Sequence, residues 1–200
     1  MKVKRYIGGT LESNGYIIYE KQGGQCFIID PGYNPKRFIK FVEENQLQCN
    51  GIILTHLHHD HVGGAKAIKD KLGCPILMHE DDAFVYKGEV DVYLKSDDVL
   101  DLEEEKLKVL HTPGHTKGSI CIMSEKSRVC FTGDTIFDTD LGRSDLAGGS
   151  ESDMRDSVCN VIDKWENDIT IYPGHDNGCT MKLVRQYNQE FLALKEGKVR

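Results

Sequence analysis

The amino-acid sequence predicts a mixed α/β fold in which β-sheets are covered by helices. The chain has 200 residues, of which 39% are hydrophobic and 28% are charged, as expected for one sizeable core. Short strand-like runs are followed by alternating strand-like and helix-like segments, and this order recurs in both halves. No low-complexity linker interrupts the chain, so we expect a single domain over residues 1–200.

In the first half, apolar runs predict strands, and apolar residues at helical spacing predict helices. The turn Asp30-Pro31-Gly32 ends the third strand, and Asn34-Pro35 begins the first helix. The run GIIL is apolar throughout, as in a strand that is buried on both faces. The expected strands are residues 2–8, 14–20, 25–30, 51–54 and 74–78, and the expected helices begin at residue 34, end at residue 73 and occupy residues 79–86.

In the second half, residues 95–106 are charged and poorly periodic, and strands return after them. Residues 151–165 carry Met154, Val158 and Trp165 at helical spacing, and residues 180–195 form the last expected helix. The expected strands of this half are residues 107–112, 119–124, 128–133 and 168–172.

The composition argues against several classes of partner. The net charge of −7 and the pI of about 5.6 give no general attraction to nucleic acid or to an anionic membrane. The N-terminal residues lack the apolar core of a secretory signal. The seven cysteines form no CxxC pair, which favours reduced thiols and a cytoplasmic protein. The sequence does not define an oligomeric state.

Side chains capable of chemistry follow four of the predicted strands. HLHHDH comes after residues 51–54, PGH follows both residues 107–112 and residues 168–172, and GDT overlaps the end of residues 128–133. Loops at the carboxyl ends of strands are where α/β folds place their sites, so we expect these loops to meet at one cleft. The side chains that they would bring there are His56, His58, Asp60, His61, His115, Asp134 and His175.

Residue spacing assigns a first group of metal ligands. Alternate side chains of an extended segment point the same way, so His56 and His58 can hold one ion together. His115 would arrive from its own loop as the third ligand, and three neutral imidazoles suit zinc. His59 points away from its neighbours and is expected to take no part.

A second group follows where the chain begins to turn. Asp60 and His61 point to an adjacent volume, where His175 can join them, and Asp134 can bridge the two groups. A set that contains carboxylates suits zinc, iron or manganese. The sequence therefore predicts two divalent metal ions, most simply zinc, about 3.5–4 Å apart.

Two further histidines have no assigned role. His79 precedes an acidic stretch, and His111 lies four residues before His115. An ordinary surface or core position is compatible with both of them. A supporting role beside the metal ions or the substrate is also compatible, so the alternatives stay open.

These motifs resemble those of the metallo-β-lactamase-fold hydrolases. The matching segments are THLHHDH at 55–61, TPGHTKGS at 112–119, FTGDTIF at 131–137, GRSDLAGG at 142–149 and YPGH at 172–175. SNGYIIYE and CFIIDPG are similar to the first strands of that family, so the resemblance spans nearly the whole chain. It is closest to the single-domain, glyoxalase-II-like members.

The resemblance implies an αββα sandwich, in which two mixed β-sheets are flanked by helices and the metals lie at one edge. It also implies the ligand sets that spacing assigns above, with Asp134 shared between the two ions. Some positions depart from the family pattern: Asp134 stands where antibiotic-degrading members generally carry cysteine or histidine, which disfavours a β-lactamase. The helical domain with which two-domain glyoxalase II enzymes help to hold glutathione would be missing or rebuilt here.

The resemblance and the ligand set together predict a metal-dependent hydrolase that acts on a small-molecule substrate, most simply the thioester of a low-molecular-weight thiol. Asp60 is the expected catalytic residue, which orients the attacking water and later passes a proton to the leaving group. Asp30 is expected to orient one of the metal-binding side chains without binding the metal itself. Arg143 is expected to bind a substrate carboxylate, and an ordinary loop salt bridge is the equal alternative.

Two other functions are compatible with the same residues. Persulfide dioxygenases are similar to this chain, including a GR-[ST]-D segment, and hold one iron ion with two histidines and one aspartate. Here those ligands would be His56, His115 and Asp134. A binding module that holds metal without turnover is the third interpretation. Spacing does not separate the hydrolase from the dioxygenase, because both retain the same motif residues.

Overall fold

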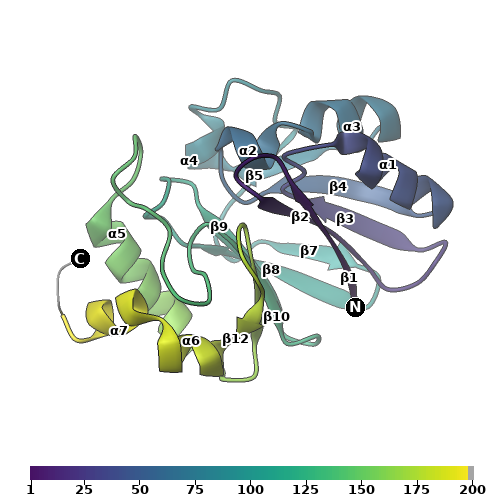
Figure 1. Ribbon diagram of the computed structural model, residues 1–200. Helices are drawn as coiled ribbons and strands as arrows, with labels where there is room; N and C mark the ends of the chain where they lie inside the picture. Colours follow the sequence, from purple (N-terminus) through teal and green to yellow (C-terminus); the bar gives the residue numbers. More distant parts are fainter. Residues whose placement is uncertain (198–200) are drawn as a thin grey trace.

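Successive side chains of the central strands pack on opposite faces, and this alternation builds four layers. In the computed structural model, which describes residues 1–197, Ile17 and Ile28 pack against helices. Their neighbours Ile18 and Ile29 pack against a second sheet. The two sheets face each other, with helices on both outer sides (Figure 1). The expected αββα sandwich of two mixed sheets is confirmed.

The first sheet contains six strands in chain order, antiparallel from β1 to β3 and parallel from β3 to β6. These strands are β1 Lys2–Gly8, β2 Ser13–Tyr19, β3 Gln25–Ile29, β4 Gln48–Leu54, β5 Ile76–His79 and β6 Val92–Leu94. The helices of this half are α1 Pro35–Glu44, α2 His59–Val62, α3 Ala65–Leu72 and α4 Glu80–Ala83. As the sequence predicts, α1 begins with a proline and α3 ends at a left-handed Gly73.

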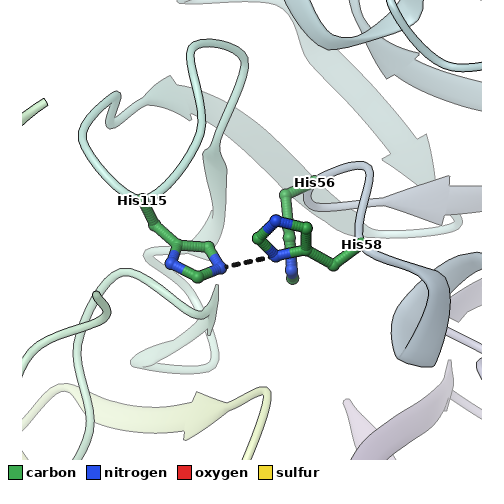
Figure 2. A group of neighbouring side chains, drawn as sticks. All are labelled: His56, His58 and His115. Carbon is green, nitrogen blue, oxygen red and sulfur yellow. Dashed lines mark hydrogen bonds between the residues drawn. The ribbon is translucent and has the colours of Figure 1, made fainter. Parts of the chain in front are cut away.

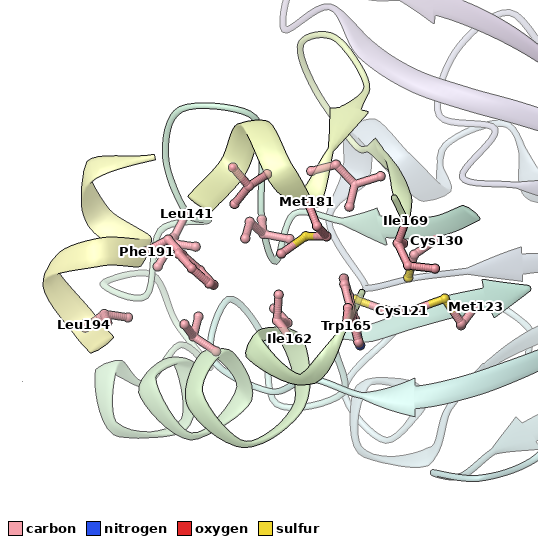
Figure 3. Packing of buried hydrophobic residues seen from close by; sticks show 14 of the residues in the cluster. Cys121, Met123, Cys130, Leu141, Ile162, Trp165, Ile169, Met181, Phe191 and Leu194 are labelled. Atoms are coloured by element: carbon pink, nitrogen blue, oxygen red, sulfur yellow. The ribbon is translucent and has the colours of Figure 1, made fainter. Parts of the chain in front are cut away.

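The second sheet has the order β12-β11-β10-β9-β8-β7, and only its β10–β11 pair is parallel among the described strands. Its strands are β7 Val99–Leu102, β8 Glu105–His111, β9 Ile120–Ser124, β10 Val129–Gly133, β11 Thr170–Pro173 and β12 Cys179–Thr180. The outer helices are α5 Glu151–Asp156, α6 Met181–Tyr187 and α7 Gln189–Lys195. Ile162, Trp165 and Phe191 fill the space between these helices and the sheet (Figure 3).

Two expected helices are divided in the structure. The helix expected over residues 151–165 continues from α5 as a π-helix, η1 Ser157–Val161, and a 3₁₀-helix, η2 Ile162–Lys164. The Ser157 hydroxyl at this change of form donates a hydrogen bond to Pro113 O (2.6 Å). The last helix is divided at Asn188, whose extended backbone (ψ 99°) ends α6 and whose side chain caps α7. Tertiary contacts override local propensity at both places.

The stretch at 95–106, which the sequence leaves without a structure, contains β7 and the start of β8. Val99 of β7 is 53% exposed, because this strand forms the edge of the second sheet. This edge strand exposes both charged and apolar side chains to solvent, so its sequence lacks the apolar pattern by which a buried strand is recognised. This explains why the sequence pattern alone does not predict it.

Two further features concern composition. All seven cysteines are free thiols, and Cys26, Cys121 and Cys130 are fully buried within strands, where they pack as small hydrophobic groups. None of the helices described in residues 1–197 is both long and apolar enough to cross a bilayer.

Asn188 provides a test of the division between α6 and α7. Its Oδ1 accepts from Phe191 N (2.8 Å), and its Nδ2 donates to Asp140 O (2.7 Å) and Phe137 O (3.2 Å). Replacing Asn188 with alanine removes the helix cap and the two bonds to the carbonyls of Phe137 and Asp140, so the free energy of unfolding should fall by about 2 kcal/mol. The exposed neighbour Gln189, changed to alanine, should have little effect. Urea denaturation of both variants measures the difference, and equal stabilities would contradict this role.

Candidate metal centre

The predicted loops meet at one edge of the sandwich because their strands share a direction. In the second sheet, β8, β10 and β11 run the same way, so the loops after them emerge at the same end. The end of β4 in the first sheet joins them, since the Ile120 N–H donates to Thr55 O (2.9 Å). All seven side chains that the sequence assigns to a cleft therefore come together here.

The first group consists of His56, His58 and His115. One ring nitrogen from each lies within 4.8 Å of the others. Figure 2 shows the rings pointing toward one another, with His58 Nδ1 2.8 Å from His115 Nε2. Asp134 Oδ2 lies 3.5 Å from His115 Nε2 and 3.8 Å from His56 Nε2. Three imidazoles and one carboxylate oxygen thus surround one small volume.

The second group consists of Asp60, His61 and His175. Asp60 Oδ2 lies 3.2 Å from His61 Nε2 and 3.3 Å from His175 Nε2. The two imidazole nitrogens are 3.3 Å apart. Asp134 reaches this group as well, since its Oδ1 is 3.4 Å from His61 Nε2 and its Oδ2 is 3.4 Å from His175 Nε2. Asp134 therefore lies between the two groups, as the sequence predicts.

Hydrogen bonds outside the cluster determine which nitrogen of two imidazoles faces inward. His115 Nδ1 donates to Arg143 O (2.7 Å), and His175 Nδ1 donates to Leu11 O (2.9 Å). A carbonyl oxygen only accepts hydrogen bonds, so Nδ1 carries the proton in both rings. In the neutral imidazoles, Nε2 then keeps a lone pair that points into the cluster.

Asp30 holds two other imidazoles from behind. Its carboxylate accepts from Thr55 N (2.8 Å) and Thr55 Oγ1 (2.5 Å), and it lies 3.4 Å from His61 Nδ1. Thr55 Oγ1 is in turn 3.1 Å from His56 Nδ1. Asp30 has a left-handed backbone (φ 47°), an unfavourable conformation for a residue other than glycine that is typical of functional sites. Asp30 thus contacts His61 directly and His56 through Thr55.

The inward-facing atoms fit a pair of divalent cations. His56 Nε2 and Asp134 Oδ1 are buried and have no hydrogen-bond partner among the described residues. Lone pairs that face one another cannot satisfy each other, whereas a cation can accept all of them. The available donors are imidazole nitrogens and carboxylate oxygens, a set that suits zinc, iron or manganese. The residues present therefore fit the metals that the sequence predicts.

The two groups differ in their electrostatics. Burial lowers the pKa of His56, His58 and His115, which favours the neutral rings that bind metal. Burial also opposes protonation of His175, but the carboxylates of Asp134 and Asp60 raise its pKa to about 10. In the metal-free protein the second group thus shares protons with its carboxylates. Cations would have to displace these protons.

Close backbone approaches explain two glycines of the motifs. A Cβ atom on Gly174 would lie 2.1 Å from Asp134 Oδ1, and a Cβ atom on Gly32 would lie 1.5 Å from Asp60 O. Any side chain at these positions would displace the carboxylate or the loop. The glycines of PGH and DPG therefore allow the ligand loops to pack against one another.

The remaining predicted residues lie outside the two groups. His59 is exposed and belongs to neither of them. The guanidinium group of Arg143 is also exposed and forms two hydrogen bonds of 2.9 Å with Asp145. His79 and His111 stack on each other, with ring centroids 4.0 Å apart, and lie beside Asp81 as a separate cluster.

Asp82 has no assigned role in the sequence-based prediction. This carboxylate is fully buried and accepts hydrogen bonds from Thr116 and Gly118 in the loop that carries His115. No pattern in the sequence distinguishes Asp82 from the exposed Glu80 and Asp81 beside it.

Residues 8–175 match the metallo-beta-lactamase superfamily. An uncharacterised protein of Mycobacterium leprae is 32% identical over 214 residues, which cover 94% of this chain and 97% of that protein. A hydroxyacylglutathione hydrolase of Francisella philomiragia is 30% identical over 177 residues, which cover 88% of this chain and 68% of that enzyme.

Solved structures agree with this match. The BLEG-1 B3 metallo-beta-lactamase has a TM-score of 0.87 at 26% identity and covers 94% of this chain and 98% of its own. The protein TTHA1623, solved in a di-iron-bound form, has a TM-score of 0.82 at 26% identity, with coverage of 92% and 98%. ETHE1 from Myxococcus xanthus has a TM-score of 0.84 at 23% identity, with coverage of 100% and 92%. The chain belongs to the metallo-beta-lactamase superfamily.

Proposed function

We propose that this protein is a metal-dependent hydrolase that cleaves the thioesters of low-molecular-weight thiols. The observation that carries the proposal is the pair of ligand groups, which share Asp134 and point unpaired nitrogen and oxygen atoms inward. A relative of 30% identity that is named hydroxyacylglutathione hydrolase supports this class of reaction. A cavity of about 240 Å³ lies beside the site, lined in part by His175, Leu11 and Asn14, and has room for part of a small-molecule substrate.

Each ligand group would hold one divalent cation, most simply zinc. His56, His58 and His115 would hold the first, and Asp60, His61 and His175 the second, with Asp134 shared. Bound there, the cations would lower the pKa of water toward about 7 and polarise a carbonyl group. The imidazoles contribute no charge, so the carboxylates of Asp60 and Asp134 supply the negative charge that offsets that of the cations.

Asp60 is the proposed catalytic residue. Burial acts to raise its pKa, but hydrogen bonds with His175 and His61 hold the pKa well below its usual range. The carboxylate is therefore ionised and can accept a hydrogen bond from water, which orients the water for attack. As the water attacks, the carboxylate takes up its proton, and it can then pass that proton to the leaving sulfur. A thiolate is a good leaving group, so it needs little assistance from a general acid.

Arg143 is the proposed contact for a substrate carboxylate. Its backbone oxygen already binds His115, so its side chain starts from the rim of the metal centre. To bind substrate, the guanidinium would exchange Asp145 for the substrate's carboxylate, with the same paired geometry. We also propose a cytoplasmic location, which the seven free thiols support.

A persulfide dioxygenase is the second candidate. Asp134 Oδ2 lies within 3.8 Å of His56 Nε2 and within 3.5 Å of His115 Nε2, so the three ligands of a single iron ion are also present. The similarity to ETHE1, at 23% identity, concerns the fold alone. The hydrolase is the preferred function because a relative of 30% identity is named hydroxyacylglutathione hydrolase, whereas the likeness to ETHE1 is one of fold.

Incubation with a panel of thioesters distinguishes the two functions. The metal-loaded protein should release free thiol, detected with a chromogenic thiol reagent, while consuming no oxygen. Metal analysis of the purified protein should find two ions per chain. Oxygen uptake with a glutathione persulfide, together with one iron per chain, would instead establish the dioxygenase. If the protein binds metal but converts no substrate, it is a metal-binding module rather than an enzyme.

Replacing Asp134 with alanine should remove at least one metal ion and nearly all activity, because Asp134 reaches both groups. The matched control is alanine at His59, which is exposed and outside both groups, and it should change neither property. Elemental analysis and thioester turnover measure the two effects. Equal damage by both substitutions would show that the ligands of this loop are misassigned.

Replacing Arg143 with alanine should raise KM about tenfold for thioesters that carry a carboxylate, since a hydrogen bond to a charged group contributes about 1.5–3 kcal/mol. The kcat value should change little. Thioesters without a carboxylate serve as the control, and their KM should be unaffected. If KM rises equally for both kinds of substrate, Arg143 has only its structural bond to Asp145.

A further inference from the structure

A buried carboxylate lies against the two loops that carry the first group of imidazoles. Asp82, in α4, is fully buried, with an exposed fraction of 0%. Its Oδ2 accepts from Thr116 Oγ1 (2.7 Å), and its Oδ1 accepts from Gly118 N (2.6 Å). Burial raises the pKa of this carboxyl, and the backbone N–H of Leu57 lies close enough to oppose that rise. One side chain thus bonds to the His115 loop and lies against the His58 loop.

The positions that Asp82 lies against are adjacent to metal ligands. Leu57 lies between His56 and His58, and Thr116 directly follows His115. His58 and His115 approach each other most closely within the first group, at 2.8 Å between ring nitrogens. The distance between these two ligands therefore depends on two loops that both lie against Asp82.

Other contacts restrain the His115 loop but do not reach the His58 loop. Ser157 donates to Pro113 O (2.6 Å), and His111 Nε2 donates to Lys117 O (2.8 Å). Thr116 also bonds to Ser119 within its own loop. Among the described residues, the contact between His58 and His115 themselves spans the two loops (2.8 Å), and Asp82 is a buried carboxylate that lies against both loops.

The negative charge of Asp82, like its hydrogen bonds, would favour binding of a cation by the first group. His56, His58 and His115 are neutral ligands, so the first group has only the shared Asp134 to offset the charge of a cation. Carboxylates placed behind ligating imidazoles orient the rings and increase their basicity.

We propose that Asp82 is a positioning residue, which holds His58 and His115 at the separation that one cation requires. The inference rests on the proposed metal-dependent function. The His115 loop packs tightly against Asp82, since a Cβ on Gly118 would lie 2.7 Å from the Asp82 Cβ. An asparagine fits the same space and keeps an acceptor for the backbone N–H groups, but it removes the charge and the bond accepted from Thr116.

The experiment measures metal affinity at each group separately. With His175 changed to alanine, the first group alone remains complete; with His58 changed to alanine, the second group alone remains complete. Zinc titration in competition with a chromophoric chelator then gives one dissociation constant for each background. Asp82→Asn should weaken the first group about 10- to 100-fold and leave the second unchanged. Cobalt absorption spectra should change in the first background only.

Two controls separate positioning from general stability. Glu80→Gln changes an exposed carboxylate on the same helix and should affect neither group. Thr116→Ser keeps the hydroxyl and should retain affinity, whereas Thr116→Val removes it and should weaken the first group. Equal weakening of both groups by Asp82→Asn, or of neither, would overturn the inference while the proposed function stands. A wild-type protein that binds no metal would overturn both.

Discussion

Mutual repulsion among inward-facing lone pairs is the constraint on which the rest of this structure depends. Imidazole nitrogens and carboxylate oxygens from four loops point into one volume, where they have too few protons to satisfy one another. The fold has to hold them there against that repulsion. It does so with bonds to the outer ring atoms, such as those from His115 to Arg143 O and from His175 to Leu11 O. Glycines such as Gly174 allow the loops to pack this closely.

The sequence predicts the parts of this structure that depend on local pattern. Alternating apolar residues predict the layers, and the positions directly after strands predict which seven side chains converge. What it misses depends on contacts between distant segments. Asn188 divides the last helix because its side chain bonds to carbonyls about 50 residues away in sequence. Asp82 has an ordinary place in a helical pattern, and only its three-dimensional neighbours, Thr116 and Gly118, make it significant.

The similar proteins share the fold of this chain but carry different functional names. Proteins named as a hydroxyacylglutathione hydrolase, a B3 metallo-beta-lactamase and an ETHE1 all resemble this chain over most of its length. A shared fold therefore leaves the substrate open. The proposed substrate would meet the exposed Arg143–Asp145 pair and the cavity beside His175. These features lie in loops, which vary more readily than the sheets.

The ligands of the centre are distributed along the polypeptide from His56 to His175, and they come from both sheets. During synthesis, the complete centre cannot assemble until residue 175 has left the ribosome. Capture of the second proposed cation would consequently follow synthesis of both sheets. The cations would then join segments from both sheets, so the apparent stability of the molecule would be linked by mass action to the free concentration of metal around it.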